Sequence, residues 1–170
     1  DTATLNIRSG KGGAGCSSFR REKYIPKGGP DGGDGGCGGS VVFKTANELR
    51  SLVDFKLSNK LWVAKDGKQG QTKKRSGLNG EDLIIYVPVG TRVYDENNEL
   101  VVDLVDDNMT YVIAKGGKGG KGNSHFSTSS NRAPTYAQPG LSGEEKTLSL
   151  TQHMTAKHSA DVDDLRRQVE

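Results

Sequence analysis

Basic side chains alternate with aromatic ones in parts of this 170-residue chain, and that combination is suited to binding nucleic acid. Arginine pairs with phosphate through a planar fork, lysine adds a point charge, and an exposed aromatic ring stacks on an unpaired base. The basic and aromatic candidates in the stretches 19–29, 65–80 and 121–134 are Arg20, Arg21, Lys23, Tyr24, Lys27, Lys73, Lys74, Arg75, Lys121, His125 and Arg132. Backbone amides of glycine-rich turns are further candidate phosphate donors. We expect contact with RNA, and an ordinary solvated basic surface is the alternative for any one residue.

Charge is spread unevenly along the chain, although the net charge is only +3. Residues 8–44 hold seven basic and three acidic side chains, residues 56–75 seven and one, and residues 115–132 four and none. Residues 81–111 hold one basic and eight acidic side chains. This distribution is typical of a polar molecule that presents one end to a polyanion.

Two glycine-rich stretches are similar to nucleotide-binding loops but lack a required part. GKGGAG (10–15) fits the pattern G-x-G-x-x-G, which also needs a following helix to hold a pyrophosphate, and Pro26 leaves no room for a long one. Cys16 and Asn123 stand where a phosphate loop needs lysine. No grouping of His, Cys, Ser or acidic residues indicates a catalytic or metal site, so we assign neither. An enzyme that uses a nucleotide is therefore a disfavoured class.

Short segments rich in Val, Ile and Tyr, separated by turn residues, predict a mainly β protein. The expected strands are Thr4–Arg8, Val41–Lys44, Asp82–Pro88, Thr91–Asp95, Leu100–Val105, Met109–Ala114 and Glu144–Leu150, with Leu49–Leu57 and Leu61–Ala64 as strand or turn and 65–80 as a loop. In residues 151–170, Ser159 could cap a short helix, or the segment could be a foreign tail. Nothing is similar to a membrane span or a signal peptide, and two cysteines, Cys16 and Cys37, favour a reducing compartment.

Glycine recurs at every third position in two stretches, which predicts an ordered role for it. The glycines that share this period are Gly29, Gly32, Gly35 and Gly38, then Gly33, Gly36 and Gly39, and later Gly116, Gly119 and Gly122. Three residues per turn is the repeat of the polyproline II helix, in which a glycine stripe lets two backbones approach closely. A flexible glycine linker is the alternative. Because the runs lie between expected strands, we favour a packed bundle.

Four long stretches identify a family resemblance: FRREKYIPKGGPDGGDGGCGGSVVF (19–43), GEDLIIYVPVGTRVYD (80–95), AKGGKGGKGNSHF (114–126) and STSSNRAPTYAQPGLSGEE (129–145). They are similar to the amino-terminal domain of the Obg family of ribosome-associated GTPases. The resemblance implies an Obg fold over residues 1–150, in which glycine-rich polyproline II segments (about 8–40 and 115–143) are built onto an eight-stranded β-barrel. The barrel strands are expected between these parts and at 144–150. Residues 151–170 depart from the family pattern.

The resemblance also implies a function. Such a domain docks on the large ribosomal subunit and binds rRNA, and its loops reach toward the peptidyl-transferase and tRNA region. The matching contact positions are Arg20, Arg21, Lys23, Tyr24, Lys27, Asn123, His125, Asn131 and Arg132, while 65–80 corresponds only by location and basic character. GTP and Mg²⁺ are implied for a GTPase domain that residues 151–170 do not match, so we expect no enzyme activity in this chain. We expect a monomer in the bacterial cytoplasm or in an organelle matrix or stroma, and a glycine-rich module that binds proteins instead of RNA is the alternative.

Overall fold

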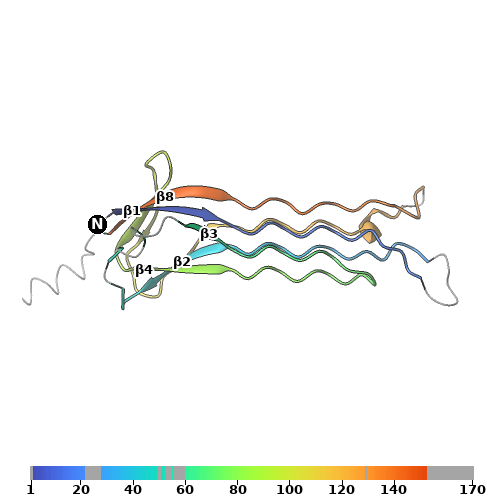
Figure 1. Ribbon diagram of the computed structural model, residues 1–170, viewed down its shortest axis with the longest axis horizontal. Coiled ribbons are helices and arrows are strands. Elements are labelled where there is room, and N and C mark those ends of the chain that lie inside the picture. The colour runs from blue at the N-terminus through green and yellow to red at the C-terminus, as the bar shows by residue number, and fades with distance from the viewer. Residues whose placement is uncertain are drawn as a thin grey trace, which may run out of the picture.

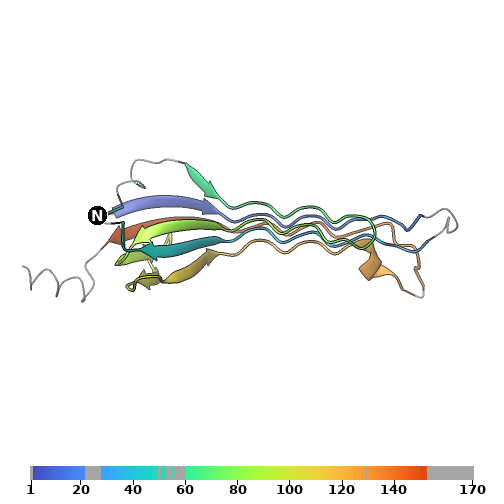
Figure 2. The ribbon, with the colours of Figure 1, turned by 90° about the horizontal axis from the view of Figure 1, so that it is seen from below.

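The computed structural model describes residues 2–21, 28–49, 51–52, 55, 60–128 and 130–152. Strands gather at one end of the molecule, and long extended segments lead away from them along a single axis (Figure 1). A view turned by 90° shows the same two parts (Figure 2). Within the described ranges, no helix is both long enough and apolar enough to cross a membrane.

The described residues contain eight strands: β1 (Thr2–Arg8), β2 (Val41–Ala46), β3 (Leu61–Val63), β4 (Leu83–Pro88), β5 (Thr91–Tyr94), β6 (Leu100–Leu104), β7 (Thr110–Ala114) and β8 (Glu145–Gln152). They form a five-stranded sheet in the order β3-β1-β8-β5-β6 and a three-stranded sheet in the order β4-β2-β7. β1 pairs antiparallel with β8 and parallel with β3, and β2 pairs parallel with β4 and antiparallel with β7. The mainly β class is therefore confirmed, and each firmly expected strand is present with small shifts at its ends. The expectation for Leu49–Leu57 lies largely outside the described residues, as does the one for the tail after Gln152.

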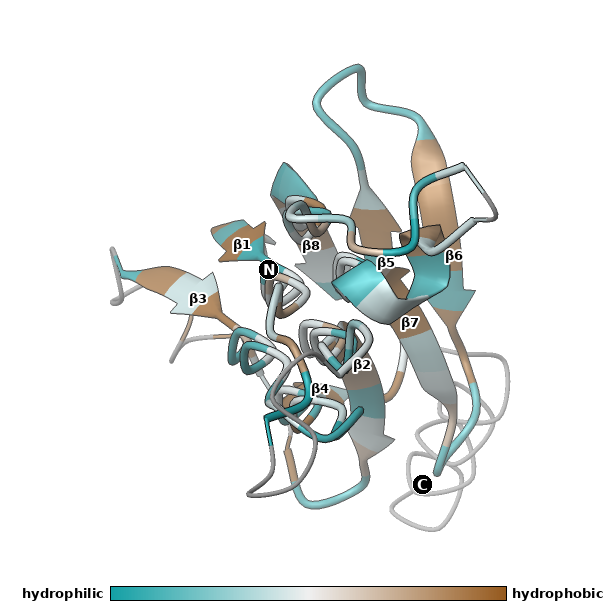
Figure 3. Ribbon diagram, turned by 90° about the vertical axis from the view of Figure 1, so that its right-hand side faces the viewer, coloured by the Kyte–Doolittle hydropathy of each residue, from teal (hydrophilic) through white to brown (hydrophobic). Residues whose placement is uncertain are grey.

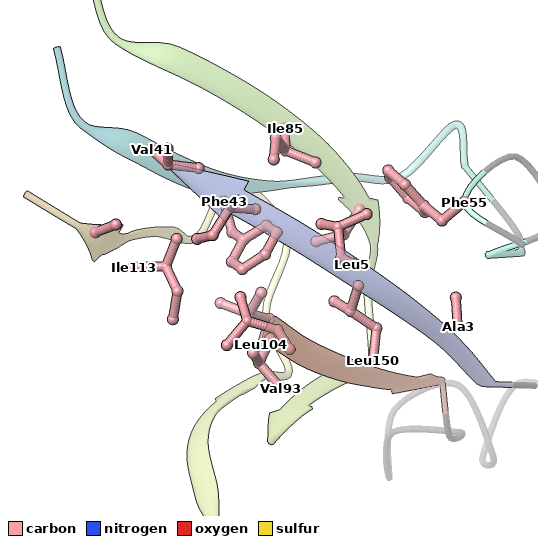
Figure 4. Packing of buried hydrophobic residues seen from close by; sticks show 14 of the residues in the cluster. Ala3, Leu5, Val41, Phe43, Phe55, Ile85, Val93, Leu104, Ile113 and Leu150 are labelled. Atoms are coloured by element: carbon pink, nitrogen blue, oxygen red, sulfur yellow. The ribbon is translucent and has the colours of Figure 1, made fainter. Parts of the chain in front are cut away.

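The hydrophobic core lies between the two sheets (Figure 4). β1 alternates exposed and buried residues, which places Leu5 and Ile7 on one face, and both are almost fully buried. Phe43 of β2 is also fully buried, as are Leu148 and Leu150 of β8. This core fixes the strand ends from which the rest of the molecule extends.

Among the described residues, hydrogen bonds do not join the strands into the closed eight-stranded barrel that the family resemblance implied. Closure needs hydrogen-bonded ladders between the edge strands of the two sheets. Among the described residues, β3 and β6 are edges of the larger sheet, and β4 and β7 are edges of the smaller one. β3 is three residues long and pairs there with β1 alone. The sheets instead face each other across the core.

Six extended segments form a bundle within the described part of the chain. They pair as three antiparallel hairpins: 9–16 with 31–39, 64–71 with 75–82, and 115–123 with 138–144. Backbone hydrogen bonds join neighbouring segments at every third residue; the amides of Gly10 and Gly13, for example, donate to the carbonyls of Gly39 and Gly36 at 2.8 Å. That repeat matches polyproline II, which has no hydrogen bonds of its own and can satisfy its backbone through neighbours. Figure 3 looks along the bundle, where the segments are coils packed side by side.

Glycine is required inside the bundle because the backbones touch. A Cβ atom on Gly35 would overlap the carbonyl oxygen of Gly13, and one on Gly119 would overlap that of Gly35. The close packing that the glycine period predicted is therefore present in segments 31–39 and 115–123, which do not behave as linkers. Gly29 is an exception, since a Cβ atom there would meet nothing within 4 Å.

The hairpin 64–82 corrects the expectation of a loop over residues 65–80. Its segments hold the same contacts as the others: the amide of Gly67 donates to the Lys11 carbonyl, and that of Gly77 donates to the Asp34 carbonyl, both at 2.8 Å. The signal was present in the spacing of its glycines, Gly67 with Gly70 and Gly77 with Gly80. Because each run is only two glycines long, the period was hard to see.

Candidate nucleic-acid interface

Three turns connect the legs of the hairpins, and they lie at the end of the bundle away from the strands (Figure 1). We name the described residues 17–21 with 28–30, 72–74, and 124–128 with 130–137 the first, second and third tip turns. Each leg is hydrogen-bonded to neighbouring segments along its length. The bundle therefore holds the tip turns at a fixed distance from the β part.

Asp31 joins the first and second tip turns. Its carboxylate accepts a hydrogen bond from the Ser18 hydroxyl at 2.6 Å and another from the Lys73 backbone amide at 3.2 Å. Its carbonyl oxygen accepts a hydrogen bond from the Lys74 amide at 2.6 Å. The residue is only 8% exposed, which protects these bonds from water. One buried acidic residue thus positions two lysines beside the first tip turn.

The second tip turn has an uncommon backbone conformation. Lys73 and Lys74 have φ angles of 59° and 56°, in the left-handed region that glycine and asparagine usually occupy. The amide of Arg75 donates to the carbonyl of Thr72 at 3.3 Å and closes the turn. A left-handed residue with a Cβ atom costs roughly 1–2 kcal/mol. Strain of this kind gathers at functional sites, where the surrounding structure holds it in place.

A pocket of about 580 Å³ opens between the first and second tip turns. Its lining residues are Phe19, Arg20, Arg21, Asp31, Thr72, Lys73 and Lys74. All four basic residues of the lining are exposed, whereas Asp31 is buried. Among the described lining residues, four cations face one carboxylate, which is itself engaged in hydrogen bonds, and this balance gives a field that attracts anions.

Asn123 is not on the contact surface to which the family resemblance assigned it. It begins the short 3₁₀ helix η1 (Asn123–Phe126) and is fully buried. Its side-chain oxygen accepts a hydrogen bond from the Gly32 amide at 2.9 Å. Its side-chain nitrogen donates to the carbonyls of Ser18 at 2.9 Å and Pro134 at 3.1 Å. Buried and engaged in this way, Asn123 cannot reach RNA and instead fastens the first tip turn to the third.

The exposed candidates of the third stretch are Lys121, His125, Asn131 and Arg132. The Nε2 atom of His125 lies 2.9 Å from a carboxylate oxygen of Asp34. Next to them, the rings of Phe126 and Tyr136 pack with their centroids 5.0 Å apart. The third tip turn therefore offers fewer cations than the other two and a partly exposed aromatic surface.

The structure separates the remaining candidates of the first two stretches. Arg75 does not line the pocket with its neighbours; its Nε atom donates to the Thr72 carbonyl at 3.3 Å. Lys23, Tyr24 and Lys27 lie outside the described residues. Sequence reasoning missed Asp31, because an acidic residue in a glycine run gives no sign that it holds a turn from elsewhere in the chain.

The glycine-rich motifs do not offer amides to a phosphate, because the bundle already uses them. Amides that donate to carbonyls of neighbouring segments include those of Gly10, Gly12, Gly13, Gly15, Gly117 and Gly120. These motifs therefore do not fit GTP with Mg²⁺. Among the described residues, no group of three or more His, Cys, Asp or Glu side chains could hold a metal ion.

The comparison with known proteins agrees with the family resemblance. The family model GTP1/OBG matches residues 1–154. The chain is 50% identical over 154 residues to a GTPase Obg of Nitratidesulfovibrio vulgaris, covering 88% of this chain and 42% of that protein. It is 48% identical over 163 residues to a GTPase Obg of Chlorobaculum parvum, covering 95% and 47%. It is 51% identical over 158 residues to a GTPase Obg of Cyanothece sp., covering 92% and 44%.

The chain spans less than half the length of the curated relatives described above. The matched part includes both sheets, the whole bundle and all three tip turns. A family model that covers residues 1–154 is decisive for membership, since it spans most of the chain. The chain therefore belongs to the GTP1/OBG family.

Proposed function

We propose that this part of the protein docks on the large ribosomal subunit by binding rRNA through its tip turns. The observation that supports the proposal most is the group of four cations, Arg20, Arg21, Lys73 and Lys74, around one pocket at the end of the bundle. A surface of this kind attracts phosphates. Its rim is built at a cost in backbone strain, which a merely solvated surface would not need.

The bundle acts as a spacer without chemistry of its own. Interlocked backbones keep the tip turns in one arrangement, so phosphate contacts supply affinity and the shape of the tip selects the site. A narrow projection can enter a cleft that a globular surface cannot. We infer that the tip turns reach toward the peptidyl-transferase and tRNA region of the large subunit during its assembly, as in the Obg fold.

The enzymatic part of this proposal rests on the relatives, of which this chain covers less than half. The relatives are named GTPases, and the glycine-rich motifs of the described residues do not fit GTP with Mg²⁺, because the bundle already uses their amides. GTP hydrolysis then belongs to a part of the protein beyond this match, and the present part delivers it to the ribosome. The protein acts in the bacterial cytoplasm, or in an organelle, as a monomer.

Cosedimentation with purified large and small ribosomal subunits tests the proposal. We expect binding to large subunits. With about six phosphate contacts, a plot of the logarithm of the affinity against the logarithm of the salt concentration should have a slope of about −4 to −5. Replacing Arg20 and Arg21 by Glu should abolish binding. Binding that is insensitive to salt, or equal for both subunits, would refute the proposal.

Exposed leucines on the flanks of the bundle favour a second candidate function. Leu78 and Leu141 are 76% and 59% exposed, although each lies on a packed segment. A protein partner could cover such side chains. A partner that is still captured by the chain after nuclease treatment, together with absent subunit binding, would favour a protein-interaction module.

A further inference from the structure

The pocket between the first and second tip turns has the size of a site for one nucleotide. We propose that it accepts a single unstacked nucleotide of RNA, with the base against Phe19 and the phosphate among the surrounding cations. The statement that the nucleotide belongs to an RNA rests on the proposed function. The pocket itself is argued from the residues that line it.

Its volume is compatible with a ligand of the size of one nucleotide. Small-molecule sites usually measure about 300–1,000 Å³, and this pocket of about 580 Å³ lies within that range. A duplex is too wide to enter it and could only pass over the rim. Bases in loops and bulges, by contrast, are free to turn away from their neighbours and enter a protein pocket.

Phe19 provides an apolar surface in an otherwise polar lining. Its backbone pairs with Pro30 in an antiparallel bridge, and the next amide, that of Arg20, donates to the Gly29 carbonyl at 2.9 Å. These contacts fix the position of the residue within the first tip turn. Among the described residues, the aromatic pairs are Phe55 with Trp62 and Phe126 with Tyr136, so Phe19 is stacked on none of them. Phe19 is half-buried and lines the pocket, where a base could contact it.

The cations stand on two turns that are fastened to each other. Arg20 and Arg21 belong to the first tip turn, and Lys73 and Lys74 belong to the second. The carboxylate of Asp31 also lines the pocket, but it accepts hydrogen bonds from both turns, which offset part of its repulsion toward a phosphate. The arrangement grips an anion from two sides, whereas a basic surface on one turn would touch it from one side.

The experiment compares two RNA hairpins of equal length and charge, one fully paired and one with a single unpaired adenosine. Stacking of one base on an aromatic residue is worth roughly 1–3 kcal/mol, so the unpaired hairpin should bind at least about fivefold more tightly. The F19L variant should lose this preference while its affinity for the paired hairpin stays unchanged. The matched control, F126L, alters an aromatic residue of the third tip turn and should retain the preference. Equal affinity for both hairpins, or a preference that survives in F19L, would overturn the inference.

Two further measurements keep the inference separate from the proposed function and from folding. Adenosine monophosphate should compete with the unpaired hairpin for the wild-type chain and not for F19L. If the monophosphate competes while large subunits fail to cosediment, the nucleotide pocket is supported and the proposal of ribosome docking is refuted. If large subunits cosediment while neither the preference nor the competition is found, only the inference of a nucleotide pocket is refuted. Should F19L unfold at a lower temperature than the wild type, replacing Lys73 by Gln provides a second variant, which should weaken competition by the monophosphate.

Discussion

The carboxylate of Asp31 accepts a hydrogen bond from the backbone amide of Lys73 at 3.2 Å, across two turns that are far apart in the sequence. The adjoining bond, from the Lys74 amide to the Asp31 carbonyl at 2.6 Å, strengthens the same connection. An acidic residue, which by charge alone repels RNA, thus holds the lysines that attract it. A change at Asp31 can therefore separate the effect of lysine position on RNA binding from the effect of net charge.

Replacing Asp31 by Ala should weaken RNA binding by roughly three- to tenfold, although it makes the tip more positive. The change removes the acceptor for Ser18 and Lys73, and lost buried hydrogen bonds of this kind cost about 1–3 kcal/mol. Fluorescence anisotropy with a labelled hairpin would measure the affinity. The control is Asp66→Ala, which removes a carboxylate that accepts the Lys11 amide away from the tip. Tighter binding by the Asp31 variant would show that charge alone matters.

The double change Lys73→Asn with Lys74→Gly should stabilise the protein and weaken its binding. Asparagine and glycine suit two successive left-handed positions, so we expect the free energy of unfolding to rise by about 1 kcal/mol. Two cations are lost from the pocket at the same time. Chemical denaturation and hairpin binding, measured on one preparation, test both effects. A variant that is less stable than the wild type would show that the turn is not strained.

Replacing Gly35 by Ala should destabilise the bundle by about 3 kcal/mol or more, because the new methyl group has no space beside the Gly13 carbonyl. Moving the segments apart would break the hydrogen bonds that join them. Gly29→Ala is the matched control, since a Cβ atom there meets nothing within 4 Å. Thermal unfolding followed by circular dichroism should separate the two variants clearly. Similar melting temperatures would mean that close packing does not explain the glycine period.

Asn123→Ala should cost about 2–4 kcal/mol of stability, because it removes the partner of the Gly32 amide and of the Pro134 carbonyl and one of the two hydrogen bonds to the Ser18 carbonyl. Asn131→Ala is the control on the exposed part of the third tip turn and should be close to neutral. Urea unfolding curves would compare them. If Asn131 proved the more important for stability and Asn123 for RNA binding alone, the structural role assigned to Asn123 would be wrong.

The strands and the glycine packing could be predicted from the sequence because both depend on local patterns. Alternating Leu5 and Ile7 indicate a half-buried strand without knowledge of its partner, and the three-residue period of Gly32, Gly35 and Gly38 indicates a backbone that is approached closely along one edge. How the strands associate could not be derived in this way. Two facing sheets in place of a closed barrel result from pairing between distant segments.

The structure brings some of the predicted candidates together and separates others, and the differences have one physical cause. Lys73 and Lys74 could be selected by charge, but their place beside Arg20 depends on Asp31, which lies 42 residues away from Lys73. Asn123 was taken for a contact residue because resemblance transfers a position and does not report burial. Residue type indicates what chemistry is available, while burial and partners decide whether it is used.

The most direct test of the account compares two charge-matched double variants in cosedimentation with large subunits. Lys73→Gln with Lys74→Gln removes two cations from the tip, while Lys65→Gln with Lys68→Gln removes two exposed cations from the flank of the same hairpin. We predict that the tip variant binds at least about tenfold more weakly than the wild type. The slope of its affinity against salt concentration should correspond to about two fewer phosphate contacts. The affinity of the flank variant should stay within about twofold of the wild type. Equal losses in both variants would contradict the claim that the bundle presents a cationic tip to RNA.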